Sequence, residues 1–418
     1  MLLKTMKYYK DLGIVMLGLL LCFGCMKKNT DPPDEPSENY KKVHAVVDSL
    51  RQALQKTSGK VFPSLNVLIN TPKEMIFVSS VAPGRNAVTP DTYFRFASNT
   101  KNMTAAAILN MQEDGWLKIT DKITGKIPGS DIPYVPATQS WNIPFKDQIT
   151  IEQLLQHSAG VYDLVNDTVP GCNGKSFTDY IDELDPNHQF TAGEFANQLR
   201  VNNLFSFPPG TNWSYSNTGY ALLSEVIARV YTFRAGTAKA FSDYMNDYLA
   251  GPAAPVPMGI RFPWLSIDQK LPEPFVASTW YKENDETIIF TKCNMSGNTA
   301  EGNAYGTMRM LNQYLRTLMT GANILTPTSV EQMQSDLSPG STSYALGCKY
   351  QMNLGYGHTG STHGYMSAMF YDPLTGVSVV AMLPVWDFSN GMSSYEHANS
   401  EMIRAMYLAR MALGYPGY

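Results

Sequence analysis

Apolar positions predict strands near both ends of the chain and helices between them. Residues 38–57 have apolar side chains at helical spacing, and the short apolar runs 65–70 and 74–82 follow, joined by a polar turn as in a β-hairpin. A second hairpin is predicted for 365–372 and 376–385, which flank an Asp-Pro-Leu-Thr-Gly turn. The two ends of the chain are therefore expected to contribute strands to one sheet.

Helical spacing recurs between these hairpins and again at the end of the chain. The segments with this spacing are 98–115, 149–160, 218–231, 308–321 and 401–413. Residues 103–111 are apolar on nearly every side, which is typical of a helix buried all round. We therefore expect an α+β fold with a mostly helical region, about 116–299, inserted between two parts of a sheet region, about 41–115 and 300–418.

The first residues resemble an export signal. Three lysines within residues 4–10 precede the apolar run 12–24, which is too short to cross a bilayer comfortably. Gly24 directly before Cys25 resembles a bacterial lipoprotein cleavage site, after which Cys25 would carry lipid; an ordinary signal peptide and an uncleaved anchor are the alternatives. We expect a signal peptide over 1–24 and a polar, proline-rich tether over 25–40, before the domain 41–418. The protein would then be an exported lipoprotein of the bacterial cell envelope, periplasmic or anchored in the outer membrane.

Composition and charge give no reason to expect nucleic acid, metal or another cofactor. The 418 residues carry a formal net charge of −4 and no basic tract. The 6 histidines are scattered, with no His-Glu-x-x-His motif and no pair of Cys-x-x-Cys motifs. Cys172, Cys293 and Cys348 lack the surroundings of a nucleophile and are expected to be structural; two of them could pair in an oxidising compartment, and the sequence leaves the choice open.

Ser98 and Lys101 stand at the start of the most hydrophobic helical segment. At a spacing of three residues they share a helix face. A serine at a helix N-terminus lies among unpaired N–H groups that favour negative charge, which suits a nucleophile whose attack creates an oxyanion. A lysine whose pKa is held near or below its ordinary value by burial could take the serine proton. The alternative is a capping serine beside a surface lysine.

Tyr215 and Asn217 form a second candidate pair, between a Pro-Pro-Gly turn and a helix expected from about Thr218. In an extended segment, residues two apart point the same way, so both side chains could face one cleft. The tyrosine could act as a general base near a lysine, and the asparagine could orient a substrate amide; a core tyrosine beside a helix cap is the alternative. The same spacing at Tyr244 and Asn246 falls in a helical pattern, where the two side chains diverge.

His358, Thr359 and Gly360 precede the second hairpin and could form an edge strand. The free N–H and C=O groups of an edge strand pair with a peptide-like substrate, and a glycine lets the backbone approach a nucleophile. The N–H of Ser361 could then join that of Ser98 in an oxyanion hole. An exposed histidine in a glycine-rich turn is the alternative interpretation.

His157 and Ser158 resemble a Ser–His pair, but they precede Gly160 at a predicted helix end. We therefore expect them to terminate the helix, with the histidine hydrogen-bonded to neighbouring structure. The sequence contains no Gly-x-Ser-x-Gly elbow to support a hydrolase triad.

Taken in order, the Ser-x-x-Lys, Tyr-x-Asn and His-Thr-Gly motifs resemble those of the penicillin-recognising serine hydrolases. This family includes class C β-lactamases, serine D-Ala-D-Ala carboxypeptidases and related esterases. Flanking blocks extend the resemblance from about residue 60 to the C-terminus, with atypical insertions near 165–200 and 230–295. The resemblance implies a β-lactamase/transpeptidase-like fold, in which an antiparallel sheet flanked by helices meets an inserted helical domain at the active site.

The resemblance also implies a role for each motif residue. Ser98 would be the acylated nucleophile, and Lys101 and Tyr215 would handle its proton. Asn217 would contact the substrate amide, and His358 would occupy the position where many members have lysine. Such a histidine is charged only in part at neutral pH and is more typical of the family's peptidases and esterases than of its β-lactamases. No glutamate is recognised in a loop of the class A kind, so Tyr215 would also serve deacylation.

The most concrete functional expectation is a D-Ala-D-Ala carboxypeptidase-like serine hydrolase. The alternatives are an esterase or acyltransferase, a β-lactamase of the same fold, and a non-catalytic protein that binds cell-wall peptides or β-lactams. The expected partners are a small peptide or ester, with a cell-wall peptide as one candidate, and a membrane through the lipid anchor. The sequence does not identify the physiological substrate or the oligomeric state.

Overall fold

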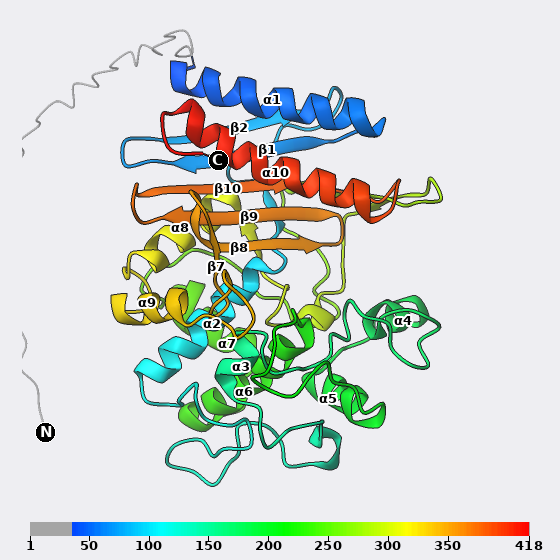
Figure 1. Ribbon diagram of the computed structural model, residues 1–418, viewed down its shortest axis with the longest axis vertical. Helices are drawn as coiled ribbons and strands as arrows, with labels where there is room; N and C mark the ends of the chain where they lie inside the picture. Colours follow the sequence, from blue (N-terminus) through cyan, green and yellow to red (C-terminus); the bar gives the residue numbers. More distant parts are fainter. Residues whose placement is uncertain (1–35, 418) are drawn as a thin grey trace, which may run out of the picture. The chain divides into compact units, whose positions relative to one another are not determined.

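The two predicted hairpins pair with each other, through β1 and β10, in one six-stranded antiparallel sheet (Figure 1). The computed structural model describes residues 36–417, and the part from Ser37 onward forms one compact unit. The sheet has the order β2-β1-β10-β9-β8-β7. Its strands are β1 (Ser64–Asn70), β2 (Met75–Val81), β7 (Lys349–Gln351), β8 (Gly355–Thr362), β9 (Tyr365–Asp372) and β10 (Val377–Leu383). Strands from both ends of the chain thus share one sheet, as predicted.

Two long helices cover one face of the sheet. α1 (Glu38–Ser58) and α10 (Met392–Ala412) pack against each other and against the strands contributed by both chain ends (Figure 1). α1 buries the apolar positions that predicted it, including Val43, Val47 and Leu54. α10 begins nine residues before the predicted 401, because its first two turns are polar and exposed and so gave no apolar period.

The other face of the sheet packs against α8 (Met308–Met319) and α2 (Asn99–Glu113). α2 is buried on all sides from Asn99 to Leu109, as its sequence predicted. It lies between the sheet and the helical region and also packs against α6 and α9. The remaining helices are α3 (Ile151–Leu155), α4 (Phe177–Leu184), α5 (Ala192–Val201), α6 (Asn217–Ala235), α7 (Phe241–Tyr244) with the π-helical turn η2 (Met245–Ala250), and α9 (Pro327–Ser335).

The region expected to be mostly helical, 116–299, also contains strands. β4 (Ser278–Tyr281) and β5 (Thr287–Phe290) form a hairpin, and β11 (Val385–Asp387) adds to β4 in parallel. Strands of four residues are too short to show a period in the sequence, so this hairpin was missed. A two-stranded sheet of β3 (Tyr93–Arg95) and β6 (Tyr305–Thr307), together with the 3₁₀ turns η1 (Gln139–Trp141) and η3 (Ser296–Asn298), completes the described elements.

Cys172, Cys293 and Cys348 are buried free thiols in the described chain, as expected for structural residues, and no two of them are bonded. The proposed lipidation site Cys25 and the signal segment 1–24 lie outside the described residues. Among residues 36–417, every helix is too short or too polar to span a bilayer.

Arg410 joins α10 to the sheet through a buried ion pair. Its Nη2 lies 2.8 Å from Asp372 Oδ2 at the end of β9, and its side chain is fully buried. Its Nε donates to the carbonyl oxygen of Pro416 at 3.1 Å. Hydrogen bonds from Thr375 and Arg410 outweigh burial and hold the pKa of the Asp372 carboxyl below its ordinary value.

We predict that Arg410→Ala lowers the free energy of unfolding by about 3–5 kcal/mol, because it leaves the buried Asp372 carboxylate without its ionic partner. The matched control is Lys126→Ala, which removes an ion pair with Asp131 whose side chains are 62% and 95% exposed. An exposed pair contributes about 0–1 kcal/mol. Urea unfolding of both variants measures the difference, and equal losses would contradict the prediction.

Candidate active site

The backbone of β8 approaches the start of α2 closely. A side chain at Gly360 would place its Cβ 2.3 Å from the carbonyl oxygen of Phe96 and 3.0 Å from Ala97 Cβ, so only glycine fits. Ser98 follows Ala97 directly and caps the N-terminus of α2 with its backbone, while its hydroxyl caps nothing. Because β7 pairs only with residues 355–357, the second half of β8 has β9 as its single strand partner in the described chain. The predicted edge strand beside the predicted nucleophile is thus present.

Lys101 lies one turn into α2 and is completely buried, with 0% of its surface exposed. Its Nζ lies 3.1 Å from Ser98 Oγ and 2.6 Å from Asn217 Oδ1. It also donates to Glu301, at 2.8 Å to the carbonyl oxygen and 3.0 Å to the carboxylate Oε2. Ser98, Asn217 and Glu301 together place four oxygens around this buried ammonium. The alternative of a surface lysine is wrong.

The pKa of Lys101 is raised, which corrects the expectation that it would be near or below its ordinary value. Burial alone would lower this pKa, but the Tyr215 oxygen and the Glu301 carboxylate outweigh burial by stabilising the ammonium. The sequence indicates the cost of burying Lys101, but it does not show that the Glu301 carboxylate lies beside it.

Tyr215 lies over the same ammonium. Lys101 Nζ is 4.8 Å from the centre of the tyrosine ring, and the phenol oxygen hydrogen-bonds with Lys101 and Ser98. Burial raises the pKa of Tyr215 and the neighbouring Lys101 opposes the rise, with a raised pKa as the net result. At neutral pH the site therefore holds a phenol beside an ammonium.

Asn217 is the first residue of α6, and its amide has one possible orientation. Oδ1 accepts from the Lys101 ammonium, and Nδ2 donates to Asp163 Oδ2 at 3.1 Å. Asp163 Oδ2 also accepts from Asn166 at 2.9 Å, and Oδ1 accepts from the N–H of Val165 at 3.1 Å. Burial raises the pKa of Asp163 to about 6 despite these hydrogen bonds.

Asp163 and Glu301 are the site residues that the sequence did not reveal. Each lies in a block that carried the family resemblance, and each has small or apolar residues on both sides in the chain. That setting was the available signal, because an acid with such neighbours is rarely buried without a partner. No spacing rule connects either acid to Lys101.

A chain of three buried rings runs behind Tyr215. His157 Nδ1 accepts from the N–H of Ser216 at 3.1 Å, so the neutral ring carries its proton on Nε2. That Nε2 lies 3.1 Å from the Tyr344 oxygen, which in turn lies 3.0 Å from His358 Nε2. His358 Nδ1 faces the carbonyl oxygen of Thr359, so it must donate and its Nε2 must accept. Every proton in this chain therefore has one position.

His358 is neutral, so the expectation of a partly charged histidine for a substrate carboxylate is wrong. Burial, reinforced by the nearby Lys101 charge, lowers the pKa of His358 to about 3. The alternative of an exposed histidine in a turn is also wrong, because the residue is buried inside β8. Its ring contacts Tyr344 rather than an open cleft.

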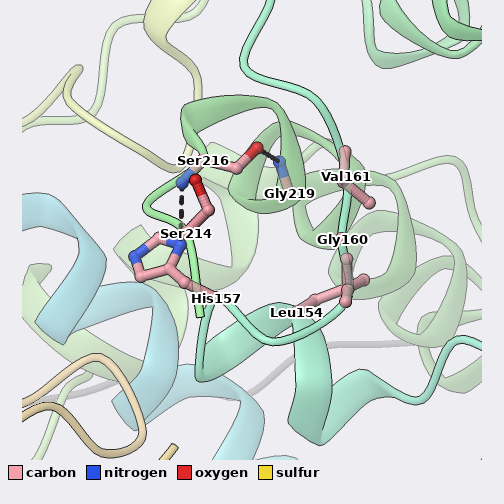
Figure 2. A pocket seen from close by; sticks show the side chains of 8 residues that line it. Leu154, His157, Gly160, Val161, Ser214, Ser216 and Gly219 are labelled. Atoms are coloured by element: carbon pink, nitrogen blue, oxygen red, sulfur yellow. Dashed lines mark hydrogen bonds between the residues drawn. The ribbon is translucent and has the colours of Figure 1, made fainter. Parts of the chain in front are cut away.

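His157 occupies the structural position expected of it. α3 ends at Leu155, and His157 itself takes a left-handed backbone with φ 59° before Gly160. Figure 2 shows its ring holding the N–H of Ser216, whose hydroxyl in turn accepts from the N–H of Gly219 at the start of α6. The small cavity drawn there has room for on the order of one water molecule and does not include Ser98 or Lys101. The cavity is too small for a substrate, and the contact that holds the segment after Tyr215 is the hydrogen bond from Ser216 to His157.

Thr359 and Ser361 point to the opposite face of β8 from His358, because side chains alternate along a strand. Ser361 Oγ accepts from Trp386 Nε1 and from the Tyr395 hydroxyl, both at 2.8 Å. These contacts fix the end of β8 against α10. The contribution of the Ser361 N–H to an oxyanion hole stays a prediction. Within residues 36–417, no three His, Cys, Asp or Glu side chains are grouped to hold a metal ion.

The beta-lactamase family model matches residues 50–394, and the chain therefore belongs to the beta-lactamase family, which confirms the resemblance. Penicillin-binding protein 4* of Bacillus subtilis (strain 168) is 26% identical over 165 residues, covering 39% of this chain and 29% of that protein. The putative penicillin-binding protein PbpX of the same strain is 22% identical over 259 residues, covering 62% and 54%. The chain thus spans about a third to a half of the length of these relatives.

Solved structures confirm the expected fold class. A D-stereospecific amidohydrolase from Streptomyces sp. superposes with a TM-score of 0.66 at 21% identity, covering 87% of this chain and 98% of the other. D-amino acid amidase from Ochrobactrum anthropi SV3, complexed with L-phenylalanine amide, superposes with a TM-score of 0.68 at 18% identity, covering 90% and 100%. At these identities the likeness shows a shared fold.

We predict that Asp163→Asn becomes more stable relative to the wild type as pH rises from about 4 to about 7. The raised pKa means that the folded wild type ionises this carboxyl at a cost that is absent below pH 4 and complete above pH 6. The difference in unfolding free energy should change by on the order of 3 kcal/mol in favour of the variant. Urea unfolding of both proteins across this range is the measurement, and a pH-independent difference would contradict the prediction.

Proposed function

We propose that this protein is a serine hydrolase that forms an acyl-enzyme on Ser98. The observation that carries the proposal is the 3.1 Å contact between Ser98 Oγ and the Nζ of a fully buried lysine. Once the Lys101 ammonium has given up one proton, its nitrogen can accept the hydroxyl proton of Ser98 as the oxygen attacks a carbonyl carbon. Membership of the beta-lactamase family supports the same chemistry.

The site offers a group for each requirement of acyl transfer. Ser98 attacks the carbonyl carbon, and Lys101 with Tyr215 takes the serine proton and delivers it to the leaving group. The N–H groups of Ser98 and Ser361 would stabilise the oxyanion. The second hydrogen of Asn217 Nδ2, beyond the one given to Asp163, is available to a substrate carbonyl oxygen.

The charges at the site favour an uncharged leaving group. His358 is neutral, and the Lys101 ammonium is paired with Glu301, so neither cation that the sequence offered is free for a substrate carboxylate. We therefore place an amide or ester of an amino acid or short peptide ahead of the carboxypeptidase substrate. The solved D-amino acid amidases of the same fold support this order. A D-Ala-D-Ala peptide remains the second candidate because the curated relatives are penicillin-binding proteins.

The nucleophile is tested by treating the full chain with a fluorescent penicillin and an activated p-nitrophenyl ester and reading intact mass. We expect one acyl adduct on the wild type and none on Ser98→Ala, with ester hydrolysis reduced by at least about 1,000-fold. Ser158→Ala is the matched control, because this buried serine also neighbours a histidine and should leave the adduct intact. An adduct on Ser98→Ala would overturn the assignment.

Relative rates on the same enzyme then distinguish the substrates. Faster turnover of D-phenylalanine amide than of an acyl-D-Ala-D-Ala peptide supports an amidase, and the reverse supports a carboxypeptidase. Rapid loss of the penicillin itself would identify a β-lactamase. Absence of any adduct or turnover would favour a non-catalytic binding protein.

We also propose that the protein is exported and anchored to the membrane by lipid on Cys25, on the strength of the apolar run 12–24 and the glycine before the cysteine. We predict that full-length protein expressed in a bacterium with an alkyne-bearing fatty acid is labelled and fractionates with membranes. Cys25→Ser should lose the label, whereas Cys22→Ser should keep it. Equal labelling of both variants would contradict the proposal.

A further inference from the structure

Glu301 is the ion-pair partner of the proposed catalytic lysine. Its Oε2 lies 3.0 Å from Lys101 Nζ, and the two side chains are 4% and 0% exposed. Its other carboxylate oxygen, Oε1, accepts from Asn298 Nδ2. An ion pair removed from water in this way costs desolvation energy that an apolar pair would avoid. The pair therefore calls for a chemical explanation in addition to a structural one.

The loop that carries Glu301 is fastened to α2 around Lys101. Thr104 Oγ1 donates to the carbonyl oxygen of Ala300 at 2.6 Å, and the N–H of Ala304 donates to Thr100 Oγ1 at 3.0 Å. Between these two bonds, Lys101 Nζ donates to the carbonyl oxygen of Glu301 at 2.8 Å. The carboxylate is thus fixed relative to the lysine by contacts on both sides of it.

Lys101 cannot accept the serine proton while it is an ammonium, because its nitrogen then has no lone pair. One of its protons must first move to a neighbouring oxygen. Asn217 supplies an amide oxygen and Glu301 a peptide oxygen, and both are far weaker bases than a carboxylate. The Ser98 and Tyr215 oxygens are protonated hydroxyls. Among the oxygens around Nζ, Glu301 Oε2 is therefore the one able to hold a further proton.

We propose that Glu301 is the proton-holding partner of Lys101, and that the two share one proton through acylation. This inference rests on the proposed acyl-enzyme function. An Nζ–H bond of Lys101 breaks as an O–H bond forms on Glu301 Oε2. The Ser98 hydroxyl proton then moves to Nζ while Oγ bonds to the substrate carbonyl carbon, whose π electrons move to its oxygen. When the tetrahedral intermediate collapses, the bond to the leaving group breaks. The leaving group takes a proton from Lys101 through Tyr215. Glu301 then returns its proton to Lys101.

The other ionisable groups near this pair are not placed to hold the Lys101 proton in place of Glu301. Asp163 hydrogen-bonds Asn217 rather than Lys101, and its carboxylate already accepts three hydrogen bonds. Tyr215 approaches Lys101 with a phenol whose pKa is raised by burial. His157 and His358 are neutral rings within the Tyr344 chain, and both have lowered pKa values because of burial and the Lys101 charge.

The pH dependence of Glu301→Gln distinguishes proton holding from structural support. Glutamine keeps the volume and accepts from Lys101, but it cannot take a proton, so Lys101 would have to lose its proton to solvent before Ser98 could react. We expect kcat/KM for the activated ester at pH 7 to fall by about 100-fold. We also expect the acidic limb of its pH profile to move to higher pH by at least about one unit. Removing the carboxylate lowers the pKa of Lys101, but a lysine still loses its proton at higher pH than a carboxylate does.

Two further variants complete the experiment. Glu301→Asp keeps a carboxylate and should retain the wild-type limb position with a lower rate, which also tests the proposal should the glutamine variant fail to fold. Asp163→Asn is the matched control, because it removes the other buried carboxylate and should not move the limb upward. The proposal would be overturned if kcat/KM of Glu301→Gln fell by the same factor at all pH values, or if the acidic limb of its pH profile moved to lower pH.

The outcome is separable from that of the proposed function. If Ser98 is not the nucleophile, Ser98→Ala keeps its adduct whatever Glu301 does. If Ser98 is the nucleophile and Glu301 only supports the loop, Ser98→Ala loses the adduct while the acidic limb of Glu301→Gln stays in place.

Discussion

The arrangement of this protein depends on one buried ammonium. Lys101 has no contact with solvent, and a bare charge at that depth would be excluded from the core. It is retained because oxygens from three separate parts of the chain reach it: a hydroxyl at the start of its own helix, an amide from the start of α6 and a carboxylate from the loop before β6. Helix α2, helix α6 and the loop before β6 therefore meet at one nitrogen atom.

The rings of His157, Tyr344 and His358, behind Tyr215, have hydrogen bonds of fixed direction. Both histidines are neutral, and the Tyr344 hydroxyl between them donates in one direction only. The two histidines therefore place no positive charge beside Tyr215. A histidine in the His-Thr-Gly motif here serves as a buried spacer and not as a cation, which changes the kind of substrate to be expected.

Sequence reasoning predicted the architecture well where the signal was local. The hairpins and the all-buried helix α2 follow from apolar spacing, and motif order identified Ser98, Lys101 and Asn217, which the structure brings into contact. It failed where the outcome depended on distant partners. The direction of the Lys101 pKa shift was wrong because Glu301 is 200 residues away in the chain. The charge expected for His358 was wrong because burial and the nearby Lys101 charge, which lower its pKa, arise only in the folded chain.

The position of Glu301 in the chain also determines when the site can form during synthesis. Bonds spanning about 200 residues fasten that loop to α2, so a nascent chain exposes the lysine long before its carboxylate partner has been synthesised. Contacts of such long sequence separation form late, after the entropy of closing the intervening chain has been overcome. The lysine therefore has no carboxylate partner until residue 301 has been synthesised. A product truncated before that residue would keep Ser98 and Lys101 but would lack the acid that neutralises the buried ammonium.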